Sequence, residues 1–414
     1  MGLFTRLMAA VGYAPMSMHD PRAWGGGGSV VAVAGVAVTA DTAAQLSVVQ
    51  AVQEVLAGNC STLPFQVFER VGEAKRPVRN HPLYRILHER PNPWQTAQEF
   101  RDEQTRHLVF ERNCYAHILS DGSAPVTGLE PIHPRRILKI ERGDGGRVYY
   151  TVAPIGVGPQ QILRDDVIWH IRKAPLTENG LAGRPVYETG REELGRALAV
   201  EYYGARFFRN SGQGGGVLKH PGSFRNKQDR DDFWENWRLR TTGEAQHSDK
   251  LLTHGVDYVP VRLNNDEAQF IDTLKLCEVK VARLWQMPPH RVGILDRATN
   301  NNIEHQGIDY VVHTLAPWIS GWEQAATRDL LVDQERDRLF CEFNVAGLLR
   351  GDIAARYRAY AAGRQWGWLS VNDIRRLENQ EPIGPQGDRY LEPENMRRAG
   401  EGQRDNPQDG PDAP

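Results

Sequence analysis

The sequence predicts an α+β protein built from several structural units. Short runs with alternating apolar residues are concentrated between residues 63 and 171, whereas long helical patterns dominate from residue 186. The 414 residues include 40% hydrophobic and 25% charged side chains, the proportions of an ordinary globular chain. At about 100–200 residues per domain, this length accommodates two or three units.

Helices are expected in the first part of the chain. Asp41 is a candidate cap for a helix with apolar residues at helical spacing, and Gly58 is expected to end it. Pro82 begins a short helix that a Pro-Asn-Pro corner ends. Thr96 and Glu99 have the spacing of a capping box, which opens another helix.

Extended segments surround these helices and complete a mixed unit over residues 40–175. The hairpin among them is predicted from Asp144-Gly145 at its turn. The predicted extended segments are 63–70, 113–119, the hairpin 136–152, and 166–171.

Long helices follow. Residues 186–210 and 265–286 each predict one helix about 30–36 Å long at 1.5 Å per residue. A third helix is expected from Ile303 past Leu331, with a kink at Pro317. The smaller expected features are the short pattern "GVLKH" at 216–220, a helix at 229–239, a hairpin at 250–263, helical structure at 350–379 and a disordered tail at 391–414.

The net charge and the cysteine content of the chain limit the classes of function that it could have. The formal net charge of -2 gives no global basic field, which excludes wholesale wrapping of nucleic acid and leaves a local contact open. The four cysteines form no CxxC pair and indicate reduced, intracellular thiols. The apolar run 29–38 is too short for a membrane span of about 20 residues, so no membrane partner is expected.

The motifs give no support to an enzyme. The glycines of "SGQGGGVLKH" lack the Lys-Ser/Thr that a phosphate-binding loop needs, and no GxSxG elbow is present. His305, Asp309 and His313 share one helical face, but a polar surface explains them without a metal. No catalytic residues, cofactor or metal are therefore predicted. Trp234 and Trp237 are separated by Glu and Asn, which favours packing over base stacking.

The order of motifs from Gly35 to Tyr390 resembles the portal proteins of tailed double-stranded DNA phages and gene transfer agents. Two departures are Arg112, where that family often has glycine, and Gln286-Met287, where Gly-Val is usual. The resemblance is carried by "HPLYRILHERPNPWQTAQEF", "RNCYAHI", "VIWHIRKAPLTENGLAGRPVYETGREELGRALAVEYYGARFFRNSGQGGGVL", "VARLWQMPPHRVG" and "EFNVAGLLRGDIAARYRAYAAGRQWGWLSVNDIRRLENQEPI", in that order and spacing.

The resemblance implies a ring, usually a dodecamer, at one vertex of the virion, with DNA in its channel. It also implies the division of the chain. The expected parts are a flexible arm (1–34), the first part of the wing (35–185), stem helices (186–210 and 265–286) flanking a clip (211–264), a tunnel loop (287–302), the second part of the wing (303–349), a crown (350–390) and a tail (391–414).

The expected partners are further copies of the chain, double-stranded DNA without sequence readout, the major capsid protein, the terminase large subunit and a head-tail adaptor protein. Assembly is expected in the cytoplasm of a bacterial host. Trp234 and Trp237 are the candidate docking residues of the clip. The candidate DNA contacts are Arg291, Arg297, Thr299, Asn300, Asn301 and Asn302, mostly short polar side chains that hydrogen-bond phosphate weakly.

Two alternatives remain open from the sequence. A virion-associated nuclease or hydrolase would need a catalytic cluster that the motifs do not provide. Another ring-forming head-completion or adaptor protein would be much shorter and would lack the long wing.

Overall fold

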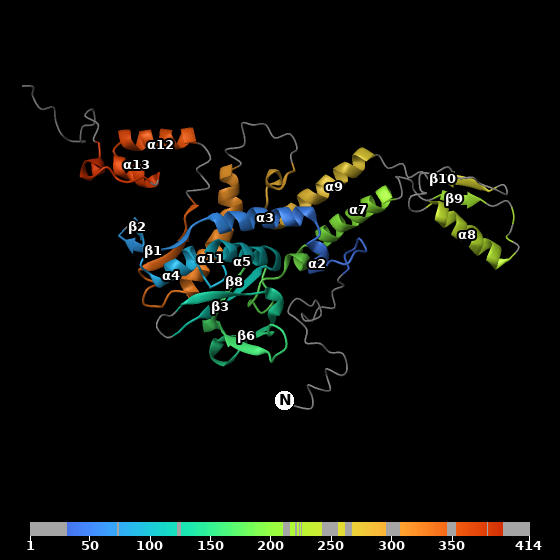
Figure 1. Ribbon diagram of the computed structural model, residues 1–414, viewed down its shortest axis with the longest axis horizontal. Helices are drawn as coiled ribbons and strands as arrows, with labels where there is room; N and C mark the ends of the chain where they lie inside the picture. Colours follow the sequence, from blue (N-terminus) through green and yellow to red (C-terminus); the bar gives the residue numbers. More distant parts are fainter. Residues whose placement is uncertain are drawn as a thin grey trace, which may run out of the picture. The chain divides into compact units, whose positions relative to one another are not determined.

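The computed structural model describes two compact units of the chain, Met1–Asn344 and Val345–Pro414 (Figure 1). The described residues are 31–72, 74–121, 126–209, 216–219, 222, 224, 226–241, 256–260, 267–294, 307–345, 353–378 and 380–391.

The first predicted helix is two helices, α2 (Ala40–Ala43) and α3 (Ser47–Thr62). Thr39, not Asp41, caps α2, because its hydroxyl accepts the N–H of residue 42 at 3.2 Å. The predicted stop at Gly58 is also wrong, since α3 continues for four more residues. An interior glycine lowers helix stability without ending the helix unless its φ turns positive.

Helices α4 (Pro82–His88) and α5 (Ala97–Glu111) confirm the next two predictions, including the capping box of Thr96 and Glu99. The Pro-Asn-Pro corner between them covers the edge of strand β4 (Gly128–Ile132). Leu129 donates its N–H to the carbonyl of Pro91 at 2.8 Å, and the Asn92 amide donates to the carbonyl of Leu129 at 3.0 Å. These bonds pair backbone groups that an open edge would leave unpaired.

Three small antiparallel sheets surround these helices, with strand orders β11-β1-β2, β4-β3-β8 and β5-β6-β7. All four predicted extended segments are confirmed as strands. Strand β11 was not predicted, although it pairs with β1 so that the rings of Phe65 and Phe343 stack 4.2 Å apart. The strands are β1 (Phe65–Val71), β2 (Ala74–Pro77), β3 (Asn113–Leu119), β5 (Ile137–Arg142), β6 (Val148–Val152), β7 (Gln161–Arg164), β8 (Ile168–Arg172) and β11 (Leu339–Phe343).

The third long helix supplies one wall of the core. Its described part begins with α-helical residues 307–309. A π-helical segment, Tyr310–Leu315, follows, and then α11 (Ala316–Asp329), which ends before the predicted limit at Leu331. The π-helical turns lie directly before Pro317, whose missing N–H cannot continue the α-helical bonding. Trp322 of α11 meets Trp169 of β8 edge to face at 5.3 Å.

A buried polar network joins two of the quoted motifs. Asn113 of "RNCYAHI" accepts the N–H of Gly183 at 2.7 Å and donates to the carbonyl of Gly183 at 2.8 Å. Asn113 Oδ1 also lies 3.1 Å from Nε2 of His170, whose Nδ1 lies 3.1 Å from the hydroxyl of Tyr150. Since Oδ1 can only accept, Nε2 carries the proton and Nδ1 accepts from Tyr150. Burial lowers the pKa of His170 well below its usual value, so the ring stays neutral.

Two positions depart from the resembled family, and both have left-handed backbone. Arg112 has φ 58° and Gln286 has φ 56°, and they are the only residues other than glycine with positive φ in the described ranges. Glycine adopts this conformation without steric cost. The Arg112 side chain makes compensating contacts: it donates to the carbonyl of Leu284 at 2.9 Å and lies over the ring of Trp318 at 5.5 Å.

The two predicted stem helices are shorter than expected. The helix predicted at 186–210 breaks at Gly190 into α6 (Val186–Thr189) and α7 (Arg191–Arg209). A Cβ at Gly190 would lie 2.6 Å from the terminal Cδ1 of Leu284, so Leu284 packs closely against this position. Helix α9 (Glu267–Ala282) ends in a 3₁₀ turn, Arg283–Trp285, before the two prolines expected to stop it.

The insert between α7 and α9 contains β9 (Gly216–Lys219), α8 (Lys227–Thr241) and β10 (Asp257–Pro260). The predicted helix is confirmed, and the short pattern at 216–220 supplies strand β9. The described part of the hairpin predicted at 250–263 differs from the prediction. There, β10 pairs antiparallel with β9. The rest of that hairpin lies outside the described residues.

At the chain ends, residues 31–34 of the predicted flexible arm are not free. Ala32 is buried against Gly195 of α7, where an added Cβ would overlap the Ala32 side chain. Val33 donates its N–H to Glu192 of α7 at 3.0 Å. Residues 1–30 of the arm lie outside the described part, as does the predicted tail after residue 391. The helical prediction for 350–379 is confirmed by α12 (Ile353–Gln365) and α13 (Val371–Leu377).

Candidate nucleic-acid interface

Helices α7 and α9 pack against each other through small and aromatic side chains (Figure 1). Tyr203 of α7 contacts Phe270 of α9 with ring centroids 5.8 Å apart. Gly204 permits this approach, since a Cβ there would lie 2.8 Å from the Phe270 ring. Cys277 and Val281 are buried on the facing side of α9. The two helices therefore form a packed pair, and α3 also packs against α9.

The charge on this helix pair has both signs. Burial raises the pKa of Glu201 on α7, and the nearby Glu278 of α9 raises it further. Burial also raises the pKa of Glu278. Arg196 pairs with Glu193 at 3.3 Å on α7. An unbroken row of cations would hold phosphates tightly, whereas mixed charge offers only weak, salt-sensitive contact to passing DNA.

The helix pair also exposes large apolar side chains. Ile271 and Leu276 of α9 are 52% and 51% exposed, and Tyr202 of α7 is 41% exposed. Five residues on an α-helix correspond to about 500° of rotation, so Ile271 and Leu276 point to different flanks of α9. A shallow groove of about 310 Å³ runs along α7, lined by Tyr202, Ala205, Arg206 and Arg209.

Arg291 is the one predicted DNA contact that the structure describes. It lies in a 3₁₀ turn, Pro289–Val292, with its guanidinium 4.6 Å from the ring centroid of Tyr310. Tyr310 is buried and its hydroxyl is 2.7 Å from the amide of Asn59 on α3. Arg291, near the start of the predicted tunnel loop, therefore contacts a residue that follows this loop in the sequence. The other five residues, Arg297, Thr299, Asn300, Asn301 and Asn302, lie outside the described residues.

The two tryptophans of α8 differ in exposure. Trp234 is 51% exposed and Trp237 is partly buried. Trp234 was expected to pack within the chain, but about half of this residue remains exposed. An aromatic contact that the sequence reasoning missed, Phe224 with Phe233 at 5.6 Å, helps to hold this insert together.

The sequence reasoning also missed a groove of about 550 Å³ beside the Pro-Asn-Pro corner. Its walls include Pro82, Ile86 and Leu119, and Arg85 and Arg90 line it as well. No motif pointed to it, because its walls come from two segments, 82–93 and 119–128, that are separated in the sequence.

The polar face formed by His305, Asp309 and His313 lies only partly within the described ranges. Asp309 and His313 lie 3.6 Å apart and are both exposed, whereas His305 is outside those ranges. No three His, Cys, Asp or Glu side chains gather there in a way that could hold a metal ion. None of the described helices has the length and apolar character to span a bilayer.

Known proteins of similar sequence are portal proteins. The chain is 28% identical over 349 residues to the portal protein of Enterobacteria phage HK97, covering 83% of this chain and 80% of that protein. It is 26% identical over 396 residues to the probable portal protein of Streptomyces phage phiC31, covering 92% and 85%.

Solved structures share the fold. The virion of a native gene transfer agent particle contains a chain with TM-score 0.58 and 17% identity, which covers 92% of this chain and 100% of its own. A crystal structure of an HK97 family phage portal protein from Corynebacterium diphtheriae has TM-score 0.57 and 14% identity, covering 77% and 99%. The family model described as "Phage portal protein" matches residues 47–379, and this chain therefore belongs to the phage portal protein family.

Proposed function

We propose that this chain assembles head to tail into a closed ring that lines a DNA channel at one vertex of a virion. The observation that carries the proposal is the α7/α9 pair, which exposes Ile271 and Leu276 on different flanks of one helix. Each subunit of a closed ring presents two different patches to its two neighbours. A neck of a native gene transfer agent particle computed with C12 symmetry, which matches at TM-score 0.57, supports twelve copies.

In this proposal the parts of the chain have separate roles. Residues 35–185 and 303–349 form the wing, α7 and α9 form the stem, and residues 211–264 form the clip. The clip docks the terminase large subunit and later the head-tail adaptor protein, and the half-exposed Trp234 offers an apolar contact for docking. The wing contacts the major capsid protein. Rings assemble in the cytoplasm of a bacterial host before they enter the virion.

The role proposed for the chain is structural and not catalytic. The portal provides a surface past which DNA moves, and the mixed charge of α7 and α9 suits that task better than a basic surface. Arg291, held over Tyr310, fixes the base of the tunnel loop at residues 287–302.

Electron microscopy of the purified chain tests the proposed function directly. We expect end-on views of closed rings with a central channel wide enough for a DNA duplex. Light scattering that finds only a stable monomer at every concentration would contradict the proposal.

Deletion of residues 299–302 tests the proposed tunnel loop. Because the anchors at Arg291 and Tyr310 stay in place, we expect rings to form normally while filled heads lose more DNA. The measurements are ring yield by light scattering and DNA per particle after a mild heat challenge. A matched control replaces Thr299 and the three asparagines by four serines, which keep hydrogen-bonding side chains and loop length. Loss of rings would show that the loop is structural, and unchanged DNA retention would exclude a DNA contact of consequence.

A further inference from the structure

Three of the sheet edges in the first unit are covered by other parts of the chain. Along β11, Cys341 and Phe343 donate their N–H groups to side chains of α11 at 3.0 Å and 2.8 Å. Strand β8 is buried at four of its five positions, and the carbonyl of His170 accepts from Arg328 at 3.4 Å. The Pro-Asn-Pro corner covers β4 in the same way. Such cover keeps an edge from pairing with a strand of another chain.

Two further edges are protected by their own sequence. Strand β2 is four residues long, carries Lys75 and Arg76, and ends at Pro77. Strand β5 has a register shift between Ile137 and Lys139, which is the mark of a bulge. Short length, charged side chains, proline and bulges all discourage the addition of another strand.

Strand β7 has none of this protection. One side of it pairs with β6, and within the described residues no other group bonds to its backbone. The strand has no proline and no register shift, and Ile162 is 68% exposed. Its one charged residue, Arg164, already pairs with Asp166 at 2.7 Å. In the described part of the chain, β7 therefore presents N–H and carbonyl groups that a further strand could pair.

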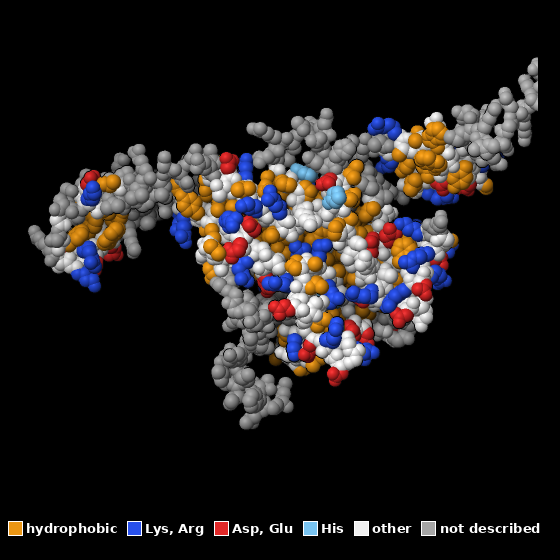
Figure 2. Space-filling view, turned by 180° about the vertical axis from the view of Figure 1, so that it is seen from behind, with side chains coloured by type: hydrophobic (Ala, Val, Ile, Leu, Met, Phe, Trp, Pro, Cys, Tyr) orange, Lys and Arg blue, Asp and Glu red, His pale blue; other side chains and the backbone are white. Residues whose placement is uncertain are grey.

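Aliphatic side chains extend this edge. Ile155 is 86% exposed and Val157 is fully exposed, both in the loop that leads into β7. Gly156 lies between them with φ 78°, a conformation that favours glycine and turns the loop here. Figure 2 shows basic and acidic side chains interspersed on the visible face of the first unit. We call β7 together with Ile155 and Val157 the open edge. Its means of recognition are backbone hydrogen bonds and aliphatic packing.

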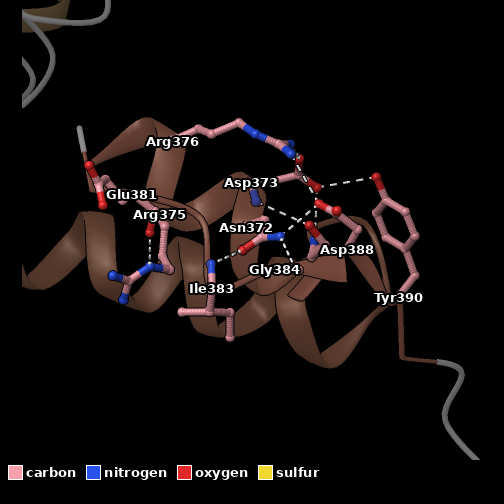
Figure 3. A network of polar contacts seen from close by, with 10 residues as sticks. Asn372, Asp373, Arg375, Arg376, Glu381, Ile383, Gly384, Asp388 and Tyr390 are labelled. Carbon is pink, nitrogen blue, oxygen red and sulfur yellow. Dashed lines mark hydrogen bonds and ion pairs between the residues drawn. The ribbon is translucent and has the colours of Figure 1, made fainter. Parts of the chain in front are cut away.

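Side chains pair irregular backbone in the C-terminal unit as well. The amide of Asn372 donates to the carbonyl of Gly384 at 2.8 Å, and its Oδ1 accepts the N–H of Ile383 at 2.9 Å (Figure 3). Arg375 donates to the carbonyl of Glu381 at 2.6 Å. Against this pattern of paired backbone, the open edge indicates a place for a partner strand.

A second copy of the chain does not fit the open edge. The other edges of the three sheets in the first unit are covered or protected, so the wings of two copies could pair only β7 with β7. That contact would be two-fold, because each copy would offer the same strand. Neighbours in a closed ring about one axis meet through two different patches instead. The occupant is therefore a different protein.

We propose that an extended, aliphatic segment of the major capsid protein adds to β7 as a fourth strand of the sheet β5-β6-β7. This inference rests on the proposed function, in which the wing contacts that protein. Strand addition gains affinity from backbone hydrogen bonds and specificity from alternating side chains. Leu163 packs against the buried cluster under the sheet, so its neighbour Ile162 points to the opposite face. An aliphatic side chain of the added strand packs beside Ile162 there.

Ile162→Lys in the full-length chain tests the inference. Ile162 is mostly exposed, so the change removes little internal packing but places a charge beside the proposed strand. Purified rings are mixed with purified, unassembled major capsid protein of the same particle. We expect the Kd of this complex to rise about tenfold or more in the variant. Hydrogen exchange of residues 161–164 should be fast in wild-type rings alone and about tenfold slower with capsid protein.

Val71→Lys is the matched control. Val71 is a β-branched residue of β1 that is 51% exposed, so it receives the same charge outside the open edge. Its Kd should equal that of the wild type. The inference is overturned if Ile162→Lys binds like Val71→Lys, or if wild-type rings do not bind the capsid protein.

The wild-type rings provide two further outcomes. Slow exchange of residues 161–164 in rings alone would identify a second copy as the occupant and would overturn the inference. Unchanged exchange in the complex would place the capsid contact elsewhere and would also overturn it. A wild-type chain that forms no rings would instead refute the proposed function, so the two failures are distinguishable.

Discussion

Replacement of Gly183 by alanine is expected to lower the free energy of unfolding by about 3 kcal/mol or more. A Cβ at this position would overlap the carbonyl oxygen of Arg112 and would lie 2.6 Å from that of Lys173. Both neighbours are backbone atoms, and the N–H of Lys173 bonds to the carbonyl of Arg112 at 2.9 Å. The strain therefore cannot be relieved by rotating a side chain.

The same change would also break the contact with Asn113. That side chain uses both donors and both acceptor sites: it bonds to the N–H and carbonyl of Gly183, to the carbonyl of Glu111 and to His170. A buried donor or acceptor that loses its partner costs about 1–3 kcal/mol. Asn113→Ala should thus be about as damaging as Gly183→Ala, because it leaves the same backbone groups unpaired.

Gly58→Ala is the matched control. Gly58 lies inside α3, and no atom lies within 4 Å of the position of an added Cβ. The same substitution should there stabilise the chain by about 0.5–1 kcal/mol, through helix propensity. Thermal unfolding of all three variants should be compared at one protein concentration, because ring assembly adds stability that depends on concentration. A Gly183→Ala variant as stable as Gly58→Ala would disprove the packing argument.

The sequence predicted the elements whose cause is local. The capping box at Thr96 and the turn at Asp144-Gly145 each set a boundary within a few residues, and the structure confirms both. The break of the predicted helix at Gly190 was missed. Leu284 packs against that position from almost one hundred residues later in the chain, a contact that no local pattern indicates.

The departures at Arg112 and Gln286 had a physical meaning that the sequence alone did not reveal. In the sequence, a larger residue in place of glycine indicates no particular backbone conformation. The structure shows that Arg112 and Gln286 both have positive φ, 58° and 56°. Strand β11 was missed for a related reason, because a short apolar run reveals its pairing with β1 only in three dimensions.

The candidate site was predictable only in part. Among the predicted DNA contacts Arg291 is described, and its position over Tyr310 is a contact that no local pattern could indicate. Trp366 and Trp368 were not singled out from the sequence, and only the structure shows that they are 49% and 74% exposed among the described residues.

Ring assembly should be abolished by Ile271→Glu alone and by Leu276→Glu alone. Each change puts a carboxylate where a neighbour is proposed to cover an apolar side chain that is now about half exposed. Burying an unpaired charge costs several kcal/mol, and the loss repeats at every contact of the ring. Glutamate is a good helix former, so α9 itself should persist. The conservative variants Ile271→Leu and Leu276→Ile should still form rings.

A mixture of the two glutamate variants then tests whether the contacts run head to tail. Ile271 and Leu276 lie on different flanks of α9, so each variant keeps one intact patch. Mixed in equal amounts, the variants should form one intact contact between the Leu276 flank of one chain and the Ile271 flank of the other. Growth then stops, since both outer flanks carry glutamate. Native mass spectrometry should therefore detect heterodimers in the mixture and monomers in each variant alone. Heterodimers are not expected from a two-fold contact in which both residues share one patch, and their absence would refute the head-to-tail arrangement.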